Sequence, residues 1–375
     1  MPSPLRLGVL TGGGDCPGLN PLIRGLVKRG VHEFGYEFVG LENGYMGLVE
    51  PDMAAPLTVE NTRGILPKGG TILGTSNKAN PFAYAVRDER GGWVEQDLSD
   101  VALRRARELG LDGLVAIGGD GTLSIAHRLS EKGLRVIGCP KTIDNDLSGT
   151  DLTFGFDTAR LIVTEAIDRL HSTAESHERV MVVEIMGRNA GFLTLESGIA
   201  GGADVILIPE LPYHLEPILQ KLHRRMQRRR SFSIIAISEG AYPAGGQLSI
   251  LERAEDTPGR GVVRLGGAGK VLADALAKHL EAEIRVTVLG HLQRGGSPSA
   301  ADRLLATRYG CKVLDLVRDG QWDHMVALRG SDIVAVPLSE SRKERRVDPK
   351  GDLVRFAKSM GVGFGDPTEG VPLAR

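Results

Sequence analysis

A short polar block with the sequence PKTIDND, residues 140–146, follows directly on an apolar run and combines two carboxylates, an amide, a hydroxyl and a lysine. Acidic side chains two residues apart on an extended segment or turn can take different tasks. Asp144 is suited to accept a proton from a hydroxyl group, and Asp146 to orient a metal ion or that base. Lys141 and Thr142 are suited to contact phosphate oxygens. The block therefore predicts acid–base chemistry beside a phosphate group.

A glycine-flanked carboxylate lies in a second polar block, GGDGT at residues 118–122, which also ends an apolar run. Asp120 can hold a magnesium ion between donor phosphates, directly or through water, and Gly121 leaves the space beside it empty. A structural alternative stays open, in which Asp120 only caps a helix that begins at Thr122. Together with PKTIDND, this block predicts a metal-assisted phosphoryl transfer to a hydroxyl group.

Glycines also dominate residues 11–20, TGGGDCPGLN, between an expected strand and an expected helix. Such a turn lets backbone amides approach a polyphosphate, but it is equally compatible with a purely structural tight turn. It is not a Walker loop, because no GKS or GKT follows. The stretch GGAGK at 266–270 fails the same test, since Val271 stands where that loop needs a hydroxyl residue. We do not expect GGAGK to bind a nucleotide.

Charged residues stand at the ends of further apolar runs. As a group they offer cations for a second phosphate and an acidic partner for sugar hydroxyls. The members are Arg179, Arg188, Glu239, Arg285, His291 and Arg294. The set predicts an acceptor that already carries a phosphate group, although each residue alone is typical of a charged surface or, for the histidine, of an ordinary loop.

Apolar runs rich in Val, Ile and Leu alternate with helical patterns along the chain. The runs cover residues 7–10, 114–117, 136–139, 180–185, 205–208, 234–237 and 284–289. The helical patterns cover residues 101–109, 123–129, 159–170, 218–226 and 271–280. Strands that are apolar on both faces and alternate with helices predict an α/β fold with doubly wound, mostly parallel sheets. Ligands in such folds bind at the carboxyl ends of strands, where the polar blocks recur.

The chain has more expected strands than a single sheet normally contains. We therefore expect two lobes with the active site between them. We place the donor-binding lobe at residues 1–155 plus about 293–343, and the acceptor-binding lobe at residues 156–292 plus the C-terminal segment. Residues 320–375 carry no recognisable chemistry, and MGVGFGDPTEGVP at 360–372 is typical of surface coil.

Charge and cysteine content narrow the functional class. The 375 residues include 46 Lys and Arg and 47 Asp and Glu, so the charges almost balance. The net charge therefore favours neither a nucleic acid nor an anionic membrane as partner. The basic run HRRMQRRR at 223–230 lacks interleaved aromatic residues, which favours a solvated helix face or a pocket for an anionic effector. Three cysteines without CxxC spacing, no export signal and no membrane-length apolar run predict a cytoplasmic protein.

PKTIDND is followed along the chain by GTDLTFGFDTA, MGRNAG, GIAGGAD and GHLQRGG, in that order. With these motifs, residues 5–308 resemble the 6-phosphofructokinase family, whose members use ATP or pyrophosphate, while the C-terminal stretch is poorly covered. The resemblance implies the two-lobed phosphofructokinase fold. It also implies phosphorylation of the C1 hydroxyl of fructose 6-phosphate with Mg²⁺ as cofactor, forming fructose 1,6-bisphosphate.

Position by position, the resemblance also implies roles for the site residues. Asp144 is the expected base, with Thr142 and Arg188 on the transferring phosphoryl group. The residues expected around the donor are Gly14, Lys78, Gly119, Asp120, Gly121 and Thr122, with Asp120 on the metal. Those expected around the acceptor are Thr142, Ile143, Asp144, Arg179, Met186, Gly187, Arg188, Glu239, Arg285, His291, Leu292, Gln293 and Arg294.

Two acceptor arginines reach the site from a neighbouring subunit in bacterial members of the family. The resemblance assigns this role to Arg179 and Arg285, so we expect a homodimer as the minimum active unit and a homotetramer as the usual one. Regulated members also carry an effector site, which Arg24, Lys28 and the basic run near Arg229 match only in part. We therefore expect a weak or altered response to phosphorylated effectors.

Gly121 and Lys141 give opposite indications of the donor. Pyrophosphate users of the family typically have an aspartate and a lysine at these positions, whereas many ATP users have glycine at both. Gly121 leaves the room that the α-phosphate of a nucleotide needs, so we favour ATP, while Lys141 keeps pyrophosphate as the alternative. Where the family commonly has an arginine near the donor, this chain has Asn77 and Lys78, and Lys78 can substitute only as a point charge.

Two other interpretations stay as remote alternatives. GGDGT also occurs in NAD kinases and lipid kinases, but these lack PKTIDND, MGR and GHLQRGG. A catalytically silent sugar-phosphate sensor is expected to lack the base or the metal acid, whereas Asp120, Asp144 and Asp146 are all present.

Overall fold

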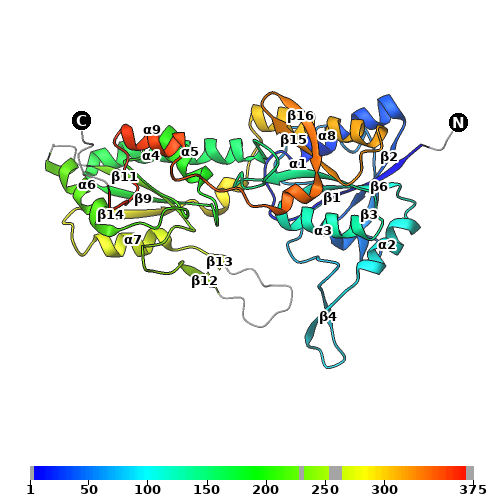
Figure 1. The fold of residues 1–375 in the computed structure, drawn as a ribbon, viewed down its shortest axis with the longest axis horizontal. Coiled ribbons are helices and arrows are strands. Elements are labelled where there is room, and N and C mark those ends of the chain that lie inside the picture. Colours follow the sequence, from blue (N-terminus) through cyan, green and yellow to red (C-terminus); the bar gives the residue numbers. More distant parts are fainter. Residues whose placement is uncertain (1–3, 228–231, 253–263, 369–375) are drawn as a thin grey trace.

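Two separate β-sheets, each with helices packed against it, lie side by side along the long axis of the molecule (Figure 1). The computed structural model describes residues 4–227, 232–252 and 264–368. This arrangement confirms the α/β fold with two mostly parallel sheets that the alternating sequence pattern predicts.

The larger sheet has eight strands in the order β16-β15-β7-β6-β1-β2-β3, with β8 pairing to β7. Its strands are β1 (Arg6–Thr11), β2 (Glu37–Leu41), β3 (Ala54–Leu57), β6 (Gly113–Gly118), β7 (Val136–Thr142), β8 (Phe154–Gly155), β15 (His324–Arg329) and β16 (Asp332–Pro337). Pairing is parallel except between β2 and β3 and between β15 and β16. The strands β7, β6 and β1 are direct neighbours, so the segments that follow them meet at one edge of the sheet.

Helices flank this sheet, and two of them approach each other closely. The helices are α1 (Leu19–Arg29), α2 (Ser99–Glu108), α3 (Asp120–Glu131) and α8 (Ala300–Arg318). Where α1 meets α8, a Cβ at Gly310 would lie 2.5 Å from the carbonyl oxygen of Leu22, so this crossing needs glycine. Leu22, Ile23 and Leu26 of α1 are fully buried, which follows from their helical spacing.

The smaller sheet has four parallel strands in the order β10-β11-β9-β14. They are β10 (Val205–Leu207), β11 (Ser233–Ser238), β9 (Val180–Ile185) and β14 (Ile284–Val288). The residues of β9 are all buried, and its apolar residues alternate between two hydrophobic clusters. One cluster includes α4 (Phe156–His177) and α5 (Phe192–Ala200), and the other includes α6 (Leu215–Gln227) and α7 (Ala268–Leu276). Helices therefore cover both faces, as a doubly wound sheet requires.

Two short hairpins and several single-turn elements complete the fold. The hairpins are β4 (Tyr84–Arg87) with β5 (Trp93–Gln96) and β12 (Ile250–Glu252) with β13 (Arg264–Leu265), and both project on the same side of the molecule (Figure 1). The turns are η1 (Gly30–Phe34), η2 (Gly44–Leu48), η3 (Gly290–Arg294) and η4 (Leu338–Arg342). Within the described part of the chain, none of the helices combines the length and apolar character that crossing a membrane requires.

The predicted apolar runs all coincide with strands, and the predicted helices exist but extend further at most of their ends. The interpretation of residues 360–372 as surface coil is wrong for residues 363–365, which are buried, whereas Met360, Gly361, Pro367 and Thr368 are exposed. Phe364 is only 1% exposed, and Gly363 forms a β-bridge with Val205 of β10. Apolar residues spaced between glycines carry no periodic signal, so their burial depends on packing that the local sequence does not reveal. The division into lobes near residue 155 stays a prediction.

Candidate active site

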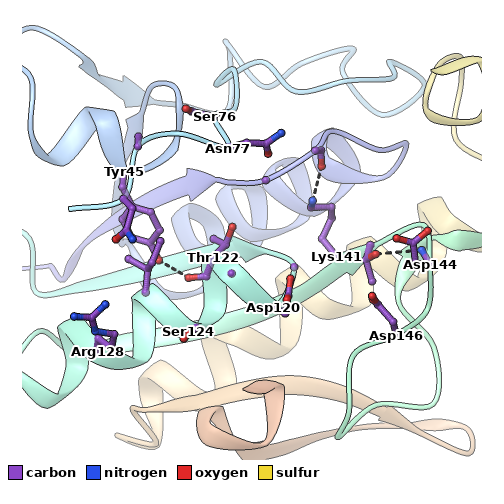
Figure 2. Close-up of a pocket in the computed structure, with 18 of the residues that line it drawn as sticks. Tyr45, Ser76, Asn77, Asp120, Thr122, Ser124, Arg128, Lys141, Asp144 and Asp146 are labelled. Carbon is purple, nitrogen blue, oxygen red and sulfur yellow. Dashed lines mark hydrogen bonds between the residues drawn. The ribbon is translucent and has the colours of Figure 1, made fainter. Parts of the chain in front are cut away.

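A cavity of about 560 Å³ opens where β1, β6 and β7 end (Figure 2). Its lining residues are Gly13, Gly14, Tyr45, Ser76, Asn77, Ala79, Asn80, Gly119, Asp120, Gly121, Thr122, Ser124, Ile125, Arg128, Lys141, Thr142, Asp144, Asp146 and Arg294. The three polar blocks at residues 11–20, 118–122 and 140–146 thus meet in one cavity. This volume lies in the range of small-ligand sites.

The GGDGT turn places a helix N-terminus at the cavity, because α3 begins at Asp120 directly after β6. Gly119 is the N-cap residue, and no side chain caps this helix end, so the structure does not support the alternative in which Asp120 is only a cap. A Cβ built on Gly121 would meet no atom of the described residues within 4 Å, which agrees with the empty space expected beside Asp120. Free amides and the helix dipole make this end favourable for phosphate.

Asp144 lies on the loop between β7 and β8, which we call the acid loop (residues 143–153). Its backbone N–H donates to Oγ1 of Thr142 at 3.1 Å, and Asn145 adopts a left-handed conformation with φ of 53°. The loop is closed by Thr153, whose hydroxyl donates to the carbonyl oxygen of Thr142 at 2.8 Å. These bonds fix the direction of Asp144 before any ligand binds.

The carboxylate of Asp144 has the environment of a general base. Its Oδ1 is buried and has no hydrogen-bond partner among the described residues. Burial raises the pKa of Asp144, and the nearby carboxylates of Glu239 and Asp120 raise it further, against the opposing effects of Arg294 and Lys141. A raised pKa and a free, desolvated oxygen both favour acceptance of a proton from a bound hydroxyl.

Lys141 is only 3% exposed, and its ammonium group donates to the carbonyl oxygen of Gly14 (Figure 2). Burial lowers the pKa of Lys141, with Asp15 and Asp144 among the groups that counteract the shift. The lysine therefore ties the glycine-rich turn after β1 to the end of β7. It supplies a fixed cation in the cavity wall rather than a mobile surface charge.

Asp120, Asp144 and Asp146 all line the cavity, together with the basic residues Arg128, Lys141 and Arg294. Burial raises the pKa of Asp146, and the carboxylates of Asp144 and Asp120 raise it further. Among the described residues, no group of three or more His, Cys, Asp or Glu forms a complete metal site. Magnesium in phosphoryl-transfer sites takes one or two carboxylates and completes its shell with phosphates and water. The carboxylates that line this cavity fit such an ion.

Arg294, Met186 and Glu239 connect the cavity to the smaller sheet. Arg294 lines the cavity and donates from Nη1 to the carbonyl oxygen of Asp15 at 3.0 Å. The backbone N–H of Met186 donates to Oε1 of Gln293 at 3.2 Å, so the MGR segment after β9 is bonded to the turn that ends at Arg294. Burial raises the pKa of Glu239, followed by the effect of the Glu184 carboxylate.

Several residues predicted around the acceptor do not line this cavity. Arg179 and Arg285 both form ion pairs with Glu283 at the β14 edge of the smaller sheet. His291 and Leu292 are exposed, the latter by 70%, whereas Ile143 and Gln293 are fully buried. Met186, Gly187 and Arg188 follow β9 and lie near Glu239 without lining the cavity. Lys78, predicted beside the donor, is exposed and outside the lining, although its neighbour Asn77 is part of it.

The sequence analysis did not identify several of the residues that line the cavity. The missed lining residues are Tyr45, Ser76, Ala79, Asn80, Ser124, Ile125 and Arg128. Ser124 and Arg128 follow Asp120 at intervals of four on α3, a helical spacing that could have identified them. The hydroxyl of Tyr45 donates to the carbonyl oxygen of Thr122 at 2.7 Å. The sequence around this tyrosine contains no motif that predicts the contact.

The GGAGK stretch, which we did not expect to bind a nucleotide, has a structural role. The N–H groups of Gly267 and Gly269, at the start of α7, donate to the carboxylate of Glu184 at 3.0 and 2.8 Å. A protein carboxylate thus occupies the amides that a phosphate would need. Of the expected effector region, Arg24 and Lys28 lie on α1 and are half-buried, whereas Arg229 lies outside the described residues.

Comparison with known proteins gives one consistent result. Residues 6–317 match the family model described as Phosphofructokinase. The ATP-dependent 6-phosphofructokinase 2 of Clostridium perfringens is 49% identical over 96% of this chain and 98% of its own. The pyrophosphate–fructose 6-phosphate 1-phosphotransferase of Streptomyces coelicolor is 48% identical over 96% of this chain and 100% of its own. The crystal structure of Pichia pastoris phosphofructokinase in the T-state superposes with a TM-score of 0.76 at 31% identity, over 91% of this chain and 36% of that one.

Proposed function

Because this chain belongs to the phosphofructokinase family, we propose that it transfers the terminal phosphoryl group of ATP to the C1 hydroxyl of fructose 6-phosphate. The product is fructose 1,6-bisphosphate, and the reaction is the phosphofructokinase step of glycolysis. One observation carries the proposal: the buried Oδ1 of Asp144, which has no hydrogen-bond partner in the described part of the chain, shares a cavity with the GGDGT turn, so a base and a phosphate-binding helix end lie together.

Asp144 is the proposed base. As the C1 oxygen bonds to the terminal phosphorus, the bond from that phosphorus to the bridging oxygen breaks, and ADP leaves with the electron pair. The proton of the C1 hydroxyl passes to Asp144 late in this process, because the loose transition state of phosphoryl transfer needs little push from the attacking oxygen. Asp144 therefore contributes to turnover more than to binding.

Most of the rate enhancement is expected from neutralising charge on the phosphoryl group. Thr142 and Arg188 are proposed to contact that group, and the buried ammonium of Lys141 adds a cation beside it. Asp120 would hold Mg²⁺, with Asp146 orienting the ion or the base, and the bound ion would neutralise the donor phosphates. The remaining donor contacts are assigned to Gly14, Lys78, Gly119, Gly121 and Thr122.

The acceptor is proposed to bind along the edge of the smaller sheet that faces the cavity. Met186, Gly187 and Glu239 are assigned to the sugar, and Arg294 and His291 to its phosphate, with Ile143, Leu292 and Gln293 as supporting residues. The hydrogen bond between Met186 and Gln293 supports this grouping, because it joins the two segments that supply most of these contacts.

Arg179 and Arg285 are proposed to serve the acceptor phosphate of a neighbouring subunit. Arg285 lies on the edge strand β14 with its side chain 59% exposed, and Arg179, which directly precedes the neighbouring strand β9, pairs with the same carboxylate of Glu283. Their shared partner Glu283 holds them at this edge until a phosphate competes for them. We propose a homodimer as the minimum active unit, a homotetramer as the usual one, and the cytoplasm as the location.

ATP is favoured over pyrophosphate by the space in the cavity. The position of Gly121 is open, and the cavity continues past it to Ser124 and Arg128, which gives room for a nucleoside. Pyrophosphate is the second candidate, because the buried cation Lys141 is typical of pyrophosphate users and relatives at nearly equal identity carry either donor in their names.

An aldolase-coupled assay with fructose 6-phosphate, Mg²⁺ and either donor tests the proposal. We expect turnover with ATP and at most weak turnover with pyrophosphate. Robust turnover with pyrophosphate and none with ATP would overturn the choice of donor. Binding of fructose 6-phosphate in calorimetry with no product from either donor would instead support a sugar-phosphate sensor.

A further inference from the structure

The segment at residues 343–347, which we call the strap, pairs with the acid loop although it lies beyond the matched family region. The backbone N–H of Arg345 donates to the carbonyl oxygen of Asp146 at 2.7 Å, and the N–H of Ser148 donates to that of Lys343 at 3.1 Å. Leu147 and Glu344 form an antiparallel β-bridge between them. The strap therefore holds the loop that carries Asp144 and Asp146 through backbone pairing with residues 146–148.

The side chain of Arg345 joins the acid loop to the smaller sheet. Its Nη1 donates to the carbonyl oxygen of Asp151 at 2.8 Å, and its guanidinium carbon lies 4.7 Å from the ring centroid of Phe192. Phe192 is the first residue of α5 and follows directly on the segment that carries Arg188. The guanidinium of Arg345 thus bonds to the acid loop, which carries the proposed base. It also stacks on the first residue of α5, the helix that follows the Arg188 segment.

A second connection runs through Glu210. Its carboxylate accepts the N–H of Val347 at 2.9 Å and that of Gly191 at 2.9 Å. Gly191 ends the segment between β9 and α5. Through Glu210, the strap is therefore also connected to the segment that carries Arg188. Figure 1 shows the chain crossing from β16 to α9 (Asp352–Ser359) between the two sheets.

We propose that Arg345 is a positioning residue that sets the distance between the acid loop and the Arg188 segment. The inference rests on the proposed function, in which Asp144 on one side must meet a sugar and a phosphoryl group held partly from the other. Displacement by about 1 Å of a reacting group can cost up to a hundredfold in rate. Arg345 touches neither substrate in this scheme, so its effect passes through the geometry of the two segments.

The test compares Arg345→Ala with Arg355→Ala. Arg355 is a matched control, because it lies in the same C-terminal region and stacks on a phenylalanine, Phe356 at 5.2 Å, but bonds to neither segment of the site. For Arg345→Ala we expect kcat about tenfold lower, KM values for both substrates within about threefold, and faster amide exchange at residues 145–151. Arg355→Ala should leave all of these unchanged.

Two further variants keep the test decisive if Arg345→Ala folds poorly. Arg345→Lys, which keeps a donor for Asp151 but loses the flat guanidinium, should recover part of kcat. Phe192→Leu should lower kcat, and combining it with Arg345→Ala should lower it no further. A wild-type kcat in Arg345→Ala, an equal loss in Arg355→Ala, or additive losses in the double variant would overturn the inference. Absence of phosphofructokinase activity in the wild-type protein would instead refute the proposed function.

Discussion

The donor end of the candidate site is built by one sheet, whereas the residues predicted to hold the acceptor are divided between the acid loop of that sheet and segments of the smaller sheet, including its exposed edge. Asp120, Lys141 and Asp144 come from neighbouring strands and line one cavity. Arg179 and Arg285 instead pair with Glu283 at the β14 edge, away from that lining. The donor end is organised within a single chain.

This difference indicates which end depends on other parts of the protein. Buried contacts such as that of Lys141 with Gly14 keep the donor end fixed without a ligand. The acceptor end depends on the spacing between the sheets and, in our proposal, on a second subunit. Substitutions at the donor end should therefore change the use of the donor in each chain separately. Substitutions at the acceptor edge should change the use of fructose 6-phosphate, and their effect should depend on assembly with a second subunit.

Gly121→Asp should produce the largest effect. A carboxylate about 4 Å from a phosphate charge costs about 4 kcal/mol at an effective dielectric constant of about 20, which is about a thousandfold in kcat/KM for ATP. Initial rates at varied ATP measure this loss, and KM for fructose 6-phosphate should change little.

Gly121→Ala is the control for that substitution. Because a Cβ at this position meets no atom within 4 Å among the residues that the structure describes, the alanine variant should keep ATP turnover within about threefold. Equal losses in both variants would show that bulk, not charge, is what position 121 excludes.

Arg285→Ala should raise KM for fructose 6-phosphate by about 30-fold, since a charge-assisted hydrogen bond is worth about 2 kcal/mol. KM for ATP should stay near its wild-type value. Mixing this variant with Asp144→Asn chains should restore activity, because a shared interface then contains one site with neither defect. With fructose 6-phosphate below the raised KM, a mixture that is no more active after subunit exchange than the two variants measured separately would contradict shared sites.

Lys141→Met should lower kcat/KM for ATP by about tenfold, because it removes a buried cation beside the phosphates. Lys78→Met, an exposed position outside the cavity lining, should cost about twofold, as expected of a screened point charge. Steady-state kinetics with both donors gives these values. A larger loss of kcat/KM in Lys78→Met than in Lys141→Met would indicate that the donor phosphates bind nearer to residues 76–80.

Asp366→Asn should have the smallest effect and act on stability alone. Burial by itself would raise the pKa of Asp366, but the Lys358 ion pair and the bonds from Thr368 outweigh it and lower the pKa to about 2. A depressed pKa stabilises the folded state above the unfolded value near 3.8, and this contribution disappears as pH falls toward 2.

The partly exposed ion pair leads us to expect a loss of about 1 kcal/mol in the free energy of unfolding at pH 7. Denaturant titration of wild type and Asp366→Asn at several pH values measures it. A difference that stays constant down to pH 3 would show that Asp366 acts through packing rather than charge. Activity at pH 7 should be unchanged, because this residue anchors the C-terminal segment far from the proposed chemistry.

The sequence predicted features that depend on local order along the chain. GGDGT and PKTIDND each follow a buried strand, and parallel neighbours bring such segments together at one edge. The positions of Asp120, Asp144 and Asp146 in one cavity follow from that rule.

Features that depend on distant packing could not be predicted. Tyr45 reaches the cavity wall through a bond to Thr122, and Arg345 reaches Phe192 across the gap between the two sheets. Neither residue stands in a motif, and single arginines and tyrosines occur widely on protein surfaces. Their neighbours are set by how the two sheets and the C-terminal segment pack, which no window of sequence encodes.

Rapid-quench measurement of a single turnover in Asp144→Asn tests the central claim most directly, because it separates phosphoryl transfer from binding and release. With ATP, Mg²⁺ and saturating fructose 6-phosphate, we expect transfer at least about a hundredfold slower than in wild type, with the affinity for fructose 6-phosphate unchanged. Transfer at close to the wild-type rate would show that Asp144 is not the base and would contradict the account.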